Sequence, residues 1–187
     1  VAIGKVIGEK VLVVSSSTGG TLGLYLASGN DNIDALVLYS PNVKIYDPTA
    51  QFLDKPWGLQ IARAVTGSNY RGWEAPEEKK KYFTTHYRIE ALVGLQSLIA
   101  NTMVKETFEK ITCPVFLGYY YKNEEEQDKV VSVKAMQKMF TQLGTFAAKK
   151  REIPFPESGS HVLCFYMDSK DIAGVERETF SFCEEVL

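Results

Sequence analysis

Residues 11–20 pass from an apolar strand pattern directly into a turn of small residues, and no other feature constrains the fold as strongly. Residues 11–14 are Val-Leu-Val-Val, and residues 15–20 are Ser-Ser-Ser-Thr-Gly-Gly. Apolar residues with helical spacing follow at Leu22, Leu24 and Leu26. A strand that turns sharply into a helix over small residues is the layout of a nucleophile elbow, in which the turn pushes a serine hydroxyl outward.

Ser17 is the serine that this geometry selects. The positions two before and two after the nucleophile must be small, because their side chains would otherwise collide across the turn. Ser17 has Ser15 before it and Gly19 after it, whereas Ser16 or Ser15 as the nucleophile would have a valine two positions earlier. Serine also stands where the general glycine-x-serine-x-glycine pattern has its first glycine.

The same turn is compatible with two other interpretations. It could be a junction without chemistry, in which the serines and the threonine cap the helix. It could also bind phosphate through the N–H groups at the helix start, as in a nucleotide-binding doubly wound domain. No glycine-x-glycine-x-x-glycine and no Walker-type lysine accompany it, which disfavours the nucleotide interpretation.

Composition excludes several classes of function. The chain has 187 residues, 45% of them hydrophobic, which is enough for one sizeable core. Its net charge of −2 gives no reason to expect a nucleic-acid partner or an anionic membrane surface. No apolar run is long enough for a transmembrane segment, no secretory signal is visible, and the compartment stays open. Cys113, Cys164 and Cys183 have no metal-like spacing, and we expect no metal and no cofactor.

Strand and helix patterns alternate over most of the chain. Strand patterns cover residues 11–15, 33–40, 114–119 and 149–155, and helical patterns cover residues 19–28, 132–144 and 168–187. This alternation predicts a parallel sheet with helices on both sides.

The middle of the chain differs in character. Prolines interrupt it, no strand pattern is convincing, and residues 77–102 are predicted to form a helix with Leu92 and Ile99 on its apolar face. We therefore expect a mostly helical insertion between strands, in the position where such segments roof a pocket.

His161 and Asp128 are the residues that can activate Ser17. A serine hydroxyl needs a base within hydrogen-bond reach, and the chain has only two histidines. His161 lies in the loop between the last predicted strand and the last helix, at the same sheet edge as Ser17. His86 is interpreted as a partly exposed residue of the insertion.

The third residue needed beside the serine and the histidine is a carboxylate in an edge loop. Asp128 fits, with rivals Glu124, Glu125, Glu126 and Asp47.

Four segments in this order resemble the α/β-hydrolases, and most closely the capped esterases that include monoacylglycerol lipase-like enzymes. They are the turn at Ser17, residues 110–115, residues 128–131 and residues 159–162. The resemblance implies a mostly parallel α/β sheet flanked by helices, with the core in residues 1–47 and 109–187 and a helical cap in residues 48–108.

The resemblance also implies an activity. It predicts a serine hydrolase that cleaves a carboxylic ester through an acyl-enzyme, with a small-molecule ester as its partner. Ser17 would be the nucleophile, His161 the proton shuttle and Asp128 its orienting acid, with the Thr18 N–H in the oxyanion site. The expected acyl-binding residues are Trp57, Leu92 and Leu95.

Two departures from the family pattern keep alternatives open. A long aromatic and acidic run separates Gly118 from Asp128. The chain also begins just before the elbow, where family members have further strands and a second oxyanion donor. We therefore expect that N-terminal strands are missing, and that a missing segment or a second copy covers the open sheet edge. The alternative functions are a non-catalytic binding protein of the same fold and an inactive fragment of a hydrolase.

Overall fold

The computed structural model describes residues 1–187, which divide into two compact units. The larger unit comprises residues 1–46 and 102–187, and the smaller one comprises residues 47–101. The expected insertion was residues 48–108. Residues 102–108 belong instead with the larger unit, because Phe108 is only 3% exposed and packs in its core.

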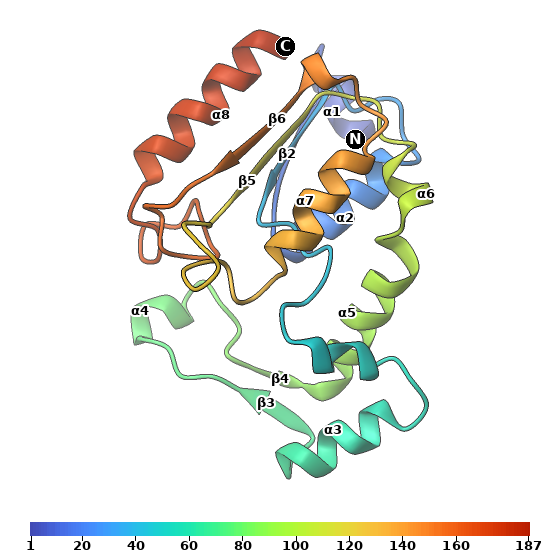
Figure 1. The fold of residues 1–187 in the computed structure, drawn as a ribbon, viewed down its shortest axis with the longest axis vertical. Coiled ribbons are helices and arrows are strands. Elements are labelled where there is room, and N and C mark those ends of the chain that lie inside the picture. The colour runs from blue at the N-terminus through green and yellow to red at the C-terminus, as the bar shows by residue number, and fades with distance from the viewer. The chain divides into compact units, whose positions relative to one another are not determined.

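The larger unit contains a four-stranded sheet in which every strand runs in the same direction (Figure 1). Its strands lie in the order β1 (Leu12–Ser16), β2 (Ala35–Tyr39), β5 (Val115–Tyr119) and β6 (Lys150–Pro154). The predicted parallel sheet is thus confirmed. Because all four carboxyl ends meet at one edge, the loops that follow the strands gather there.

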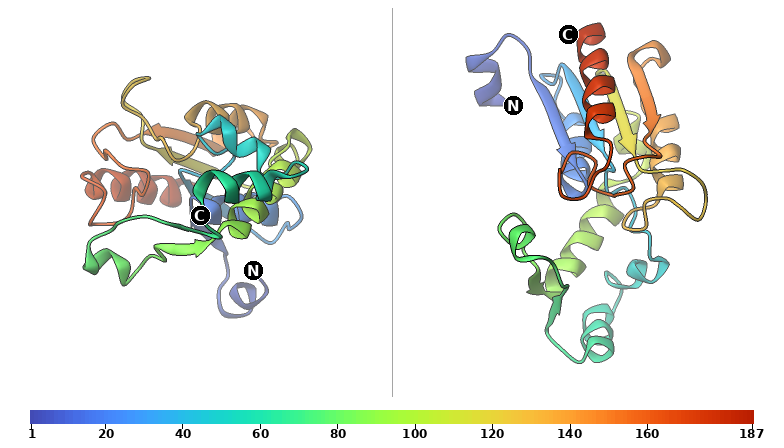
Figure 2. Two further views of the ribbon diagram at one scale, coloured as in Figure 1. Left: turned by 90° about the horizontal axis from the view of Figure 1, so that it is seen from below. Right: turned by 90° about the vertical axis from the view of Figure 1, so that its left-hand side faces the viewer.

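Helices cover both faces of this sheet, as Figures 1 and 2 show. On one face, α2 (Thr18–Ala27), α6 (Lys105–Phe108) and α7 (Val133–Gln142) pack against Leu36 and Leu38 of β2. On the other face, α8 (Ile172–Val186) packs against Val37. The strands β2 and β5 are buried at all positions, which explains their continuous apolar sequences. The remaining elements are α1 (Ala2–Ile7) and η2 (Ala147–Lys149). No helix combines the length and the apolar character that a membrane span requires.

The smaller unit is less helical than the sequence pattern predicts. Its elements are η1 (Pro48–Phe52), α3 (Gly58–Thr66), β3 (Tyr70–Gly72), α4 (Glu77–Lys80), β4 (His86–Arg88) and the start of α5 (Ile89–Thr102). The single helix predicted for residues 77–102 is wrong, since a loop and β4 separate α4 from α5. Two threonines and the His-Tyr-Arg sequence favour extended backbone over residues 84–88, and β4 pairs antiparallel with β3.

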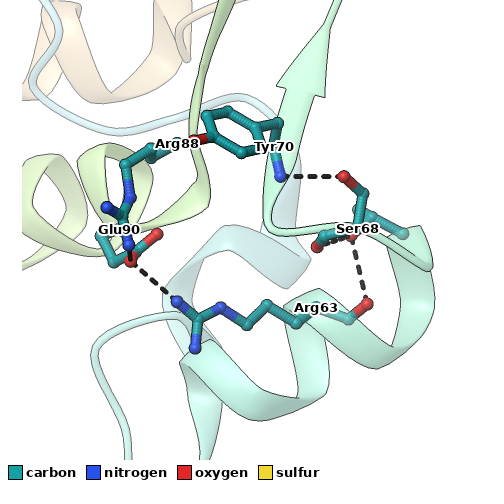
Figure 3. A network of polar contacts seen from close by, with 6 residues as sticks. Arg63, Ser68, Tyr70, Arg88 and Glu90 are labelled. Atoms are coloured by element: carbon teal, nitrogen blue, oxygen red, sulfur yellow. Dashed lines mark hydrogen bonds and ion pairs between the residues drawn. The ribbon is translucent and has the colours of Figure 1, made fainter.

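A charged cluster joins three elements of the smaller unit (Figure 3). The Glu90 carboxylate at the start of α5 accepts hydrogen bonds from Arg88 of β4 at 2.5 Å and from Arg63 of α3 at 2.7 Å. The Arg88 guanidinium, with Arg63 beside it, holds the pKa of Glu90 below its usual value. Ser68 accepts the Tyr70 N–H at 3.0 Å and so shapes the turn into β3. The ion pairs of Glu90 therefore connect the hairpin, α3 and the start of α5.

Two glycines test the packing of the two units with the same substitution. Gly144 follows α7, and a Cβ there would overlap the backbone oxygen of Glu109. Gly94 lies within α5, where a Cβ would meet nothing within 4 Å. We expect Gly144→Ala to lower the free energy of unfolding by about 1–3 kcal/mol. Gly94→Ala should raise the free energy of unfolding by about 0.5–1 kcal/mol, because alanine favours the helix more than glycine does.

Urea unfolding of the two variants under one set of conditions measures both effects. Equal stabilities of the two variants would contradict the packing described around Gly144.

Candidate active site

Three loops at the carboxyl edge of the sheet bring together residues that are far apart in the sequence. Ser17 directly follows β1, Asp128 lies in the loop after β5, and His161 lies in the loop after β6. The imidazole Nε2 of His161 is 2.9 Å from Ser17 Oγ, across 144 residues of sequence. Its Nδ1 is 2.6 Å from Asp128 Oδ2. The three side chains form one continuous hydrogen-bonded chain.

The arrangement of donors and acceptors fixes the tautomer of the histidine. A carboxylate oxygen can only accept, so the ring proton of His161 lies on Nδ1 and points to Asp128. In the neutral imidazole, Nε2 is then the acceptor that faces the Ser17 hydroxyl. The Asp128 side chain is fully buried and that of His161 is 12% exposed, so little water competes for these hydrogen bonds. In this arrangement His161 Nε2 is within reach to accept the proton of the Ser17 hydroxyl.

Ser17 has a strained backbone conformation, with φ 53° and ψ −122°. A residue with a side chain in such a region costs about 1–3 kcal/mol and persists only where its surroundings hold it. Here the Ser17 N–H donates to the Tyr39 carbonyl at 2.9 Å. The Ser17 carbonyl accepts the N–H groups of Gly20 and Asn42, each at 2.9 Å. The turn is thus fastened to the end of β2, and the Ser17 hydroxyl faces His161.

The tightest contact of the turn lies one residue beyond the pair that the sequence indicated. A Cβ on Gly19 would lie 3.8 Å from the Cβ of Ser15, which is an ordinary contact that leaves room for a methyl group. A Cβ on Gly20 would lie 2.6 Å from Pro41 Cβ, so only glycine fits there without movement. Gly20 and Pro41 were not among the predicted site residues. Two features of the sequence could have indicated this contact: the second glycine of Gly19-Gly20, and the proline two residues after the end of β2.

The long acidic run before Asp128 closes on itself and leaves Asp128 at the sheet edge. Tyr121 and Gln127 form an isolated antiparallel bridge, and the Lys122 N–H donates to the Glu126 carbonyl at 2.9 Å. The Asp128 N–H accordingly returns to the carbonyl of Tyr120 at 3.1 Å. Asp128 Oδ1 accepts the N–H groups of the two residues at 130 and 131, at 2.8 and 3.1 Å, which leaves Oδ2 for the histidine.

The structure places the rival acids away from His161. Glu124, Glu125 and Glu126 are exposed at the tip of that closed loop. Asp47 caps η1, where its Oδ1 accepts the Thr49 N–H at 2.8 Å, and hydrogen bonds from Thr49 lower the pKa of Asp47. Asp128 is therefore the carboxylate that the structure brings to His161. The second histidine, His86, is exposed in β4 and stacks on Tyr70 with ring centroids 4.7 Å apart.

Thr18 is the first residue of α2, so its N–H belongs to the four amides at a helix start that lack an intrahelical acceptor. The helix start favours negative charge there. Trp57, Leu92 and Leu95 belong to the smaller unit. Trp57 precedes α3 and is 72% exposed, while the two leucines are half-buried on α5. Their binding of an acyl group stays a prediction.

The three cysteines take no part in the hydrogen bonds that join Ser17, His161 and Asp128. Cys113, Cys164 and Cys183 are all free. Burial raises the pKa of the Cys113 and Cys183 thiols, which lowers the fraction of reactive thiolate. No group of three or more His, Cys, Asp or Glu side chains is arranged to hold a metal ion.

No protein-family model and no curated protein sequence matches the chain. Solved structures of lipolytic enzymes do match its fold. A structure of LipS and LipT, two metagenome-derived lipolytic enzymes, matches with a TM-score of 0.73 and 13% identity, over 97% of this chain and 67% of that one. A soluble variant of the Saccharomyces cerevisiae monoglyceride lipase, in complex with a substrate analogue, matches with a TM-score of 0.67 and 12% identity. The match covers 98% of this chain and 64% of that one. The Paleococcus ferrophilus monoacylglycerol lipase matches with a TM-score of 0.58 and 18% identity, over 82% of this chain and 61% of that one.

The chain has the fold of the α/β-hydrolases, as the resemblance in its sequence implied. It spans about two thirds of the length of these solved structures. At such low identity the likeness concerns the fold, and the chemistry depends on the residues of this chain.

The strain at Ser17 predicts an unusual order of stabilities. Glycine adopts a positive φ without the steric penalty of a Cβ. Ser17→Gly should therefore be more stable than Ser17→Ala, by about 1 kcal/mol in the free energy of unfolding. Urea unfolding measures the difference. Ser16→Gly and Ser16→Ala provide the control within β1, where alanine should be the more stable of the two. The same order at both positions would contradict strain at Ser17.

Proposed function

We propose that the chain carries the catalytic residues of a serine hydrolase that cleaves carboxylic esters. One observation carries the proposal: Ser17, His161 and Asp128 are linked by hydrogen bonds of 2.9 and 2.6 Å, with Ser17 on a strained turn at a helix start. The lipolytic enzymes that share the fold support ester cleavage as the reaction class.

In the first half of the reaction, Ser17 Oγ attacks the ester carbonyl carbon and its proton passes to His161 Nε2. The imidazolium that forms is stabilised by the carboxylate of Asp128. The carbonyl π electrons move to oxygen, and the resulting oxyanion receives the Thr18 N–H at the start of α2. When the intermediate collapses, His161 protonates the leaving alcohol and the acyl group remains on Ser17.

In the second half, His161 accepts a proton from water, whose oxygen attacks the acyl carbon. Collapse of this intermediate returns the proton to Ser17 Oγ and releases the carboxylic acid. The Thr18 N–H serves both intermediates. Loss of one oxyanion donor typically slows such reactions about a hundred- to a thousand-fold, so the orientation of this amide matters to the rate.

The proposed substrate class is an ester with an apolar acyl group. Trp57, Leu92 and Leu95 are proposed as acyl-binding residues, since they supply large apolar side chains in the smaller unit. The yeast monoglyceride lipase binds a substrate analogue, and we extend ester binding from that protein to this chain as part of the proposal.

A fluorophosphonate probe tests the nucleophile directly. The probe should modify Ser17, located by mass spectrometry, because phosphonylation needs an activated hydroxyl. Ser17→Ala should lose the label and lower the hydrolysis of p-nitrophenyl butyrate by at least about 10⁴-fold. Ser16→Ala changes the neighbouring serine and should keep both signals.

Absence of label on the folded chain would favour a non-catalytic binding protein of the same fold. Label on a longer natural chain that contains these residues, but not on residues 1–187, would instead place a missing requirement outside this sequence. Label on a residue other than Ser17 would contradict the assignment.

The acid is tested by charge-neutral substitutions. Asp128→Asn preserves the shape but does not hold the histidine in the required tautomer, so kcat should fall by about 10⁴-fold. A matched triple variant, Glu124→Gln with Glu125→Gln and Glu126→Gln, should stay within about twofold of the original kcat, since these side chains are exposed at the loop tip. A large loss of kcat in the triple variant, with kcat unchanged in Asp128→Asn, would show that a glutamate of the loop is the acid.

A further inference from the structure

The peptide between Ser17 and Thr18 has a hydrogen-bonded carbonyl at one end and the proposed oxyanion donor at the other. It is trans, so its C=O and N–H point in opposite directions. The Asn42 N–H donates to the Ser17 carbonyl at 2.9 Å. The Gly20 N–H donates to the same carbonyl at 2.9 Å, so whatever holds Asn42 contributes, together with the first turn of α2, to the direction of the Thr18 N–H. Hydrogen bonding at the carbonyl further polarises the amide, which strengthens it as a donor.

Asn42 is held by a buried threonine of α2. The Thr21 hydroxyl donates to the Asn42 carbonyl at 2.7 Å. Thr21 is fully buried and Asn42 is 4% exposed. Pro41, which precedes Asn42, lies directly against Gly20, so the segment after β2 has little room to shift.

The hydroxyl of Thr21 does not make the hydrogen bond that is usual for threonine within a helix. Such hydroxyls often donate to the carbonyl four residues earlier. Thr66 and Thr179 do so here, to the carbonyls of Ala62 and Val175 at 2.9 and 2.8 Å. For Thr21 that carbonyl would be the one of Ser17. Thr21 instead donates across to Asn42, and the Ser17 carbonyl receives backbone N–H groups.

We infer that Thr21 is a positioning residue of the active site. Its hydroxyl fixes Asn42, and the Asn42 N–H fixes the Ser17–Thr18 peptide so that the Thr18 N–H points at the oxyanion. Thr21 touches no reacting atom in this scheme. The inference rests on the proposed function for its effect on rate, while the hydrogen-bonded arrangement itself does not depend on it.

The test compares two buried threonines whose hydroxyls both donate to backbone carbonyls. Thr21→Val removes the hydroxyl beside the site. Thr145→Val removes a hydroxyl that donates to the carbonyls of Ile111 and Cys113 at 3.1 and 2.7 Å. Both variants should lose thermal stability. Only Thr21→Val should slow fluorophosphonate labelling and the kcat for p-nitrophenyl butyrate, by about tenfold, a part of what loss of a whole donor causes. KM should change less than about twofold.

Thr21→Ser restores the hydroxyl and should recover the labelling rate to within about threefold. Thr21→Ala, which adds no methyl group, replaces Thr21→Val if the valine variant does not fold. A Thr21→Val protein labelled as fast as Thr145→Val, with the same loss of stability, would overturn the inference.

Amide NMR separates a failure of this inference from a failure of the proposed function. In Thr21→Val, the Thr18 and Asn42 N–H resonances should shift and the Asn42 amide should exchange at least about tenfold faster, with neither change in Thr145→Val. Unchanged Thr18 and Asn42 signals in Thr21→Val overturn the positioning role whether or not the chain is active. Absence of label both on the original chain and on a longer natural chain, with these NMR changes present in Thr21→Val, refutes the proposed function alone.

Discussion

The common direction of the four strands is the constraint on which the rest of the structure depends. Because β1, β2, β5 and β6 are all parallel, the segments that carry Ser17, Asp128 and His161 leave the sheet at one edge. Residues 144 positions apart thereby come within hydrogen-bond distance. The apolar side chains on both faces of β2 and β5 are buried in the two clusters that the helices cover, and this burial stabilises the arrangement.

The sheet also supplies the restraint that the strained turn requires. The last residue of β2 and the segment after it hold the turn by hydrogen bonds, through the Tyr39 carbonyl and the Asn42 N–H. Ser40, between them, is itself fully buried with φ 42°, and its N–H donates to the Gly118 carbonyl of β5 at 2.8 Å. Two neighbouring segments with positive φ thus share one network of backbone hydrogen bonds. The conformation of Ser17 is a property of two strands and a helix together, and not of its own sequence alone.

Sequence patterns predicted those parts of the fold whose periodicity is set by burial. The strands β2 and β5 were predicted because both of their faces are buried. Ser17 was predicted from the small residues around it, although the structure leaves room for a methyl group at Gly19 and places the tight contact at Gly20. The hairpin of β3 and β4 was missed because three-residue strands, exposed along β3, leave almost no alternation to detect. Thr21 and Asn42 could not be identified either. Their roles depend on one hydrogen bond between segments 21 residues apart, and no local pattern encodes such a contact.

The features that distinguish a hydrolase from a binding protein of the same fold are the energetically unfavourable ones. A fold shared at 12–18% identity supports either function. A serine with φ 53° and a fully buried carboxylate both destabilise a folded chain unless their surroundings compensate. Here the compensation is specific, since two backbone N–H groups and one imidazole satisfy Asp128. A binding surface would need neither the strain nor the buried charge. The strained serine and the buried carboxylate lie at opposite ends of one hydrogen-bonded chain with His161 between them, and this combination favours catalysis.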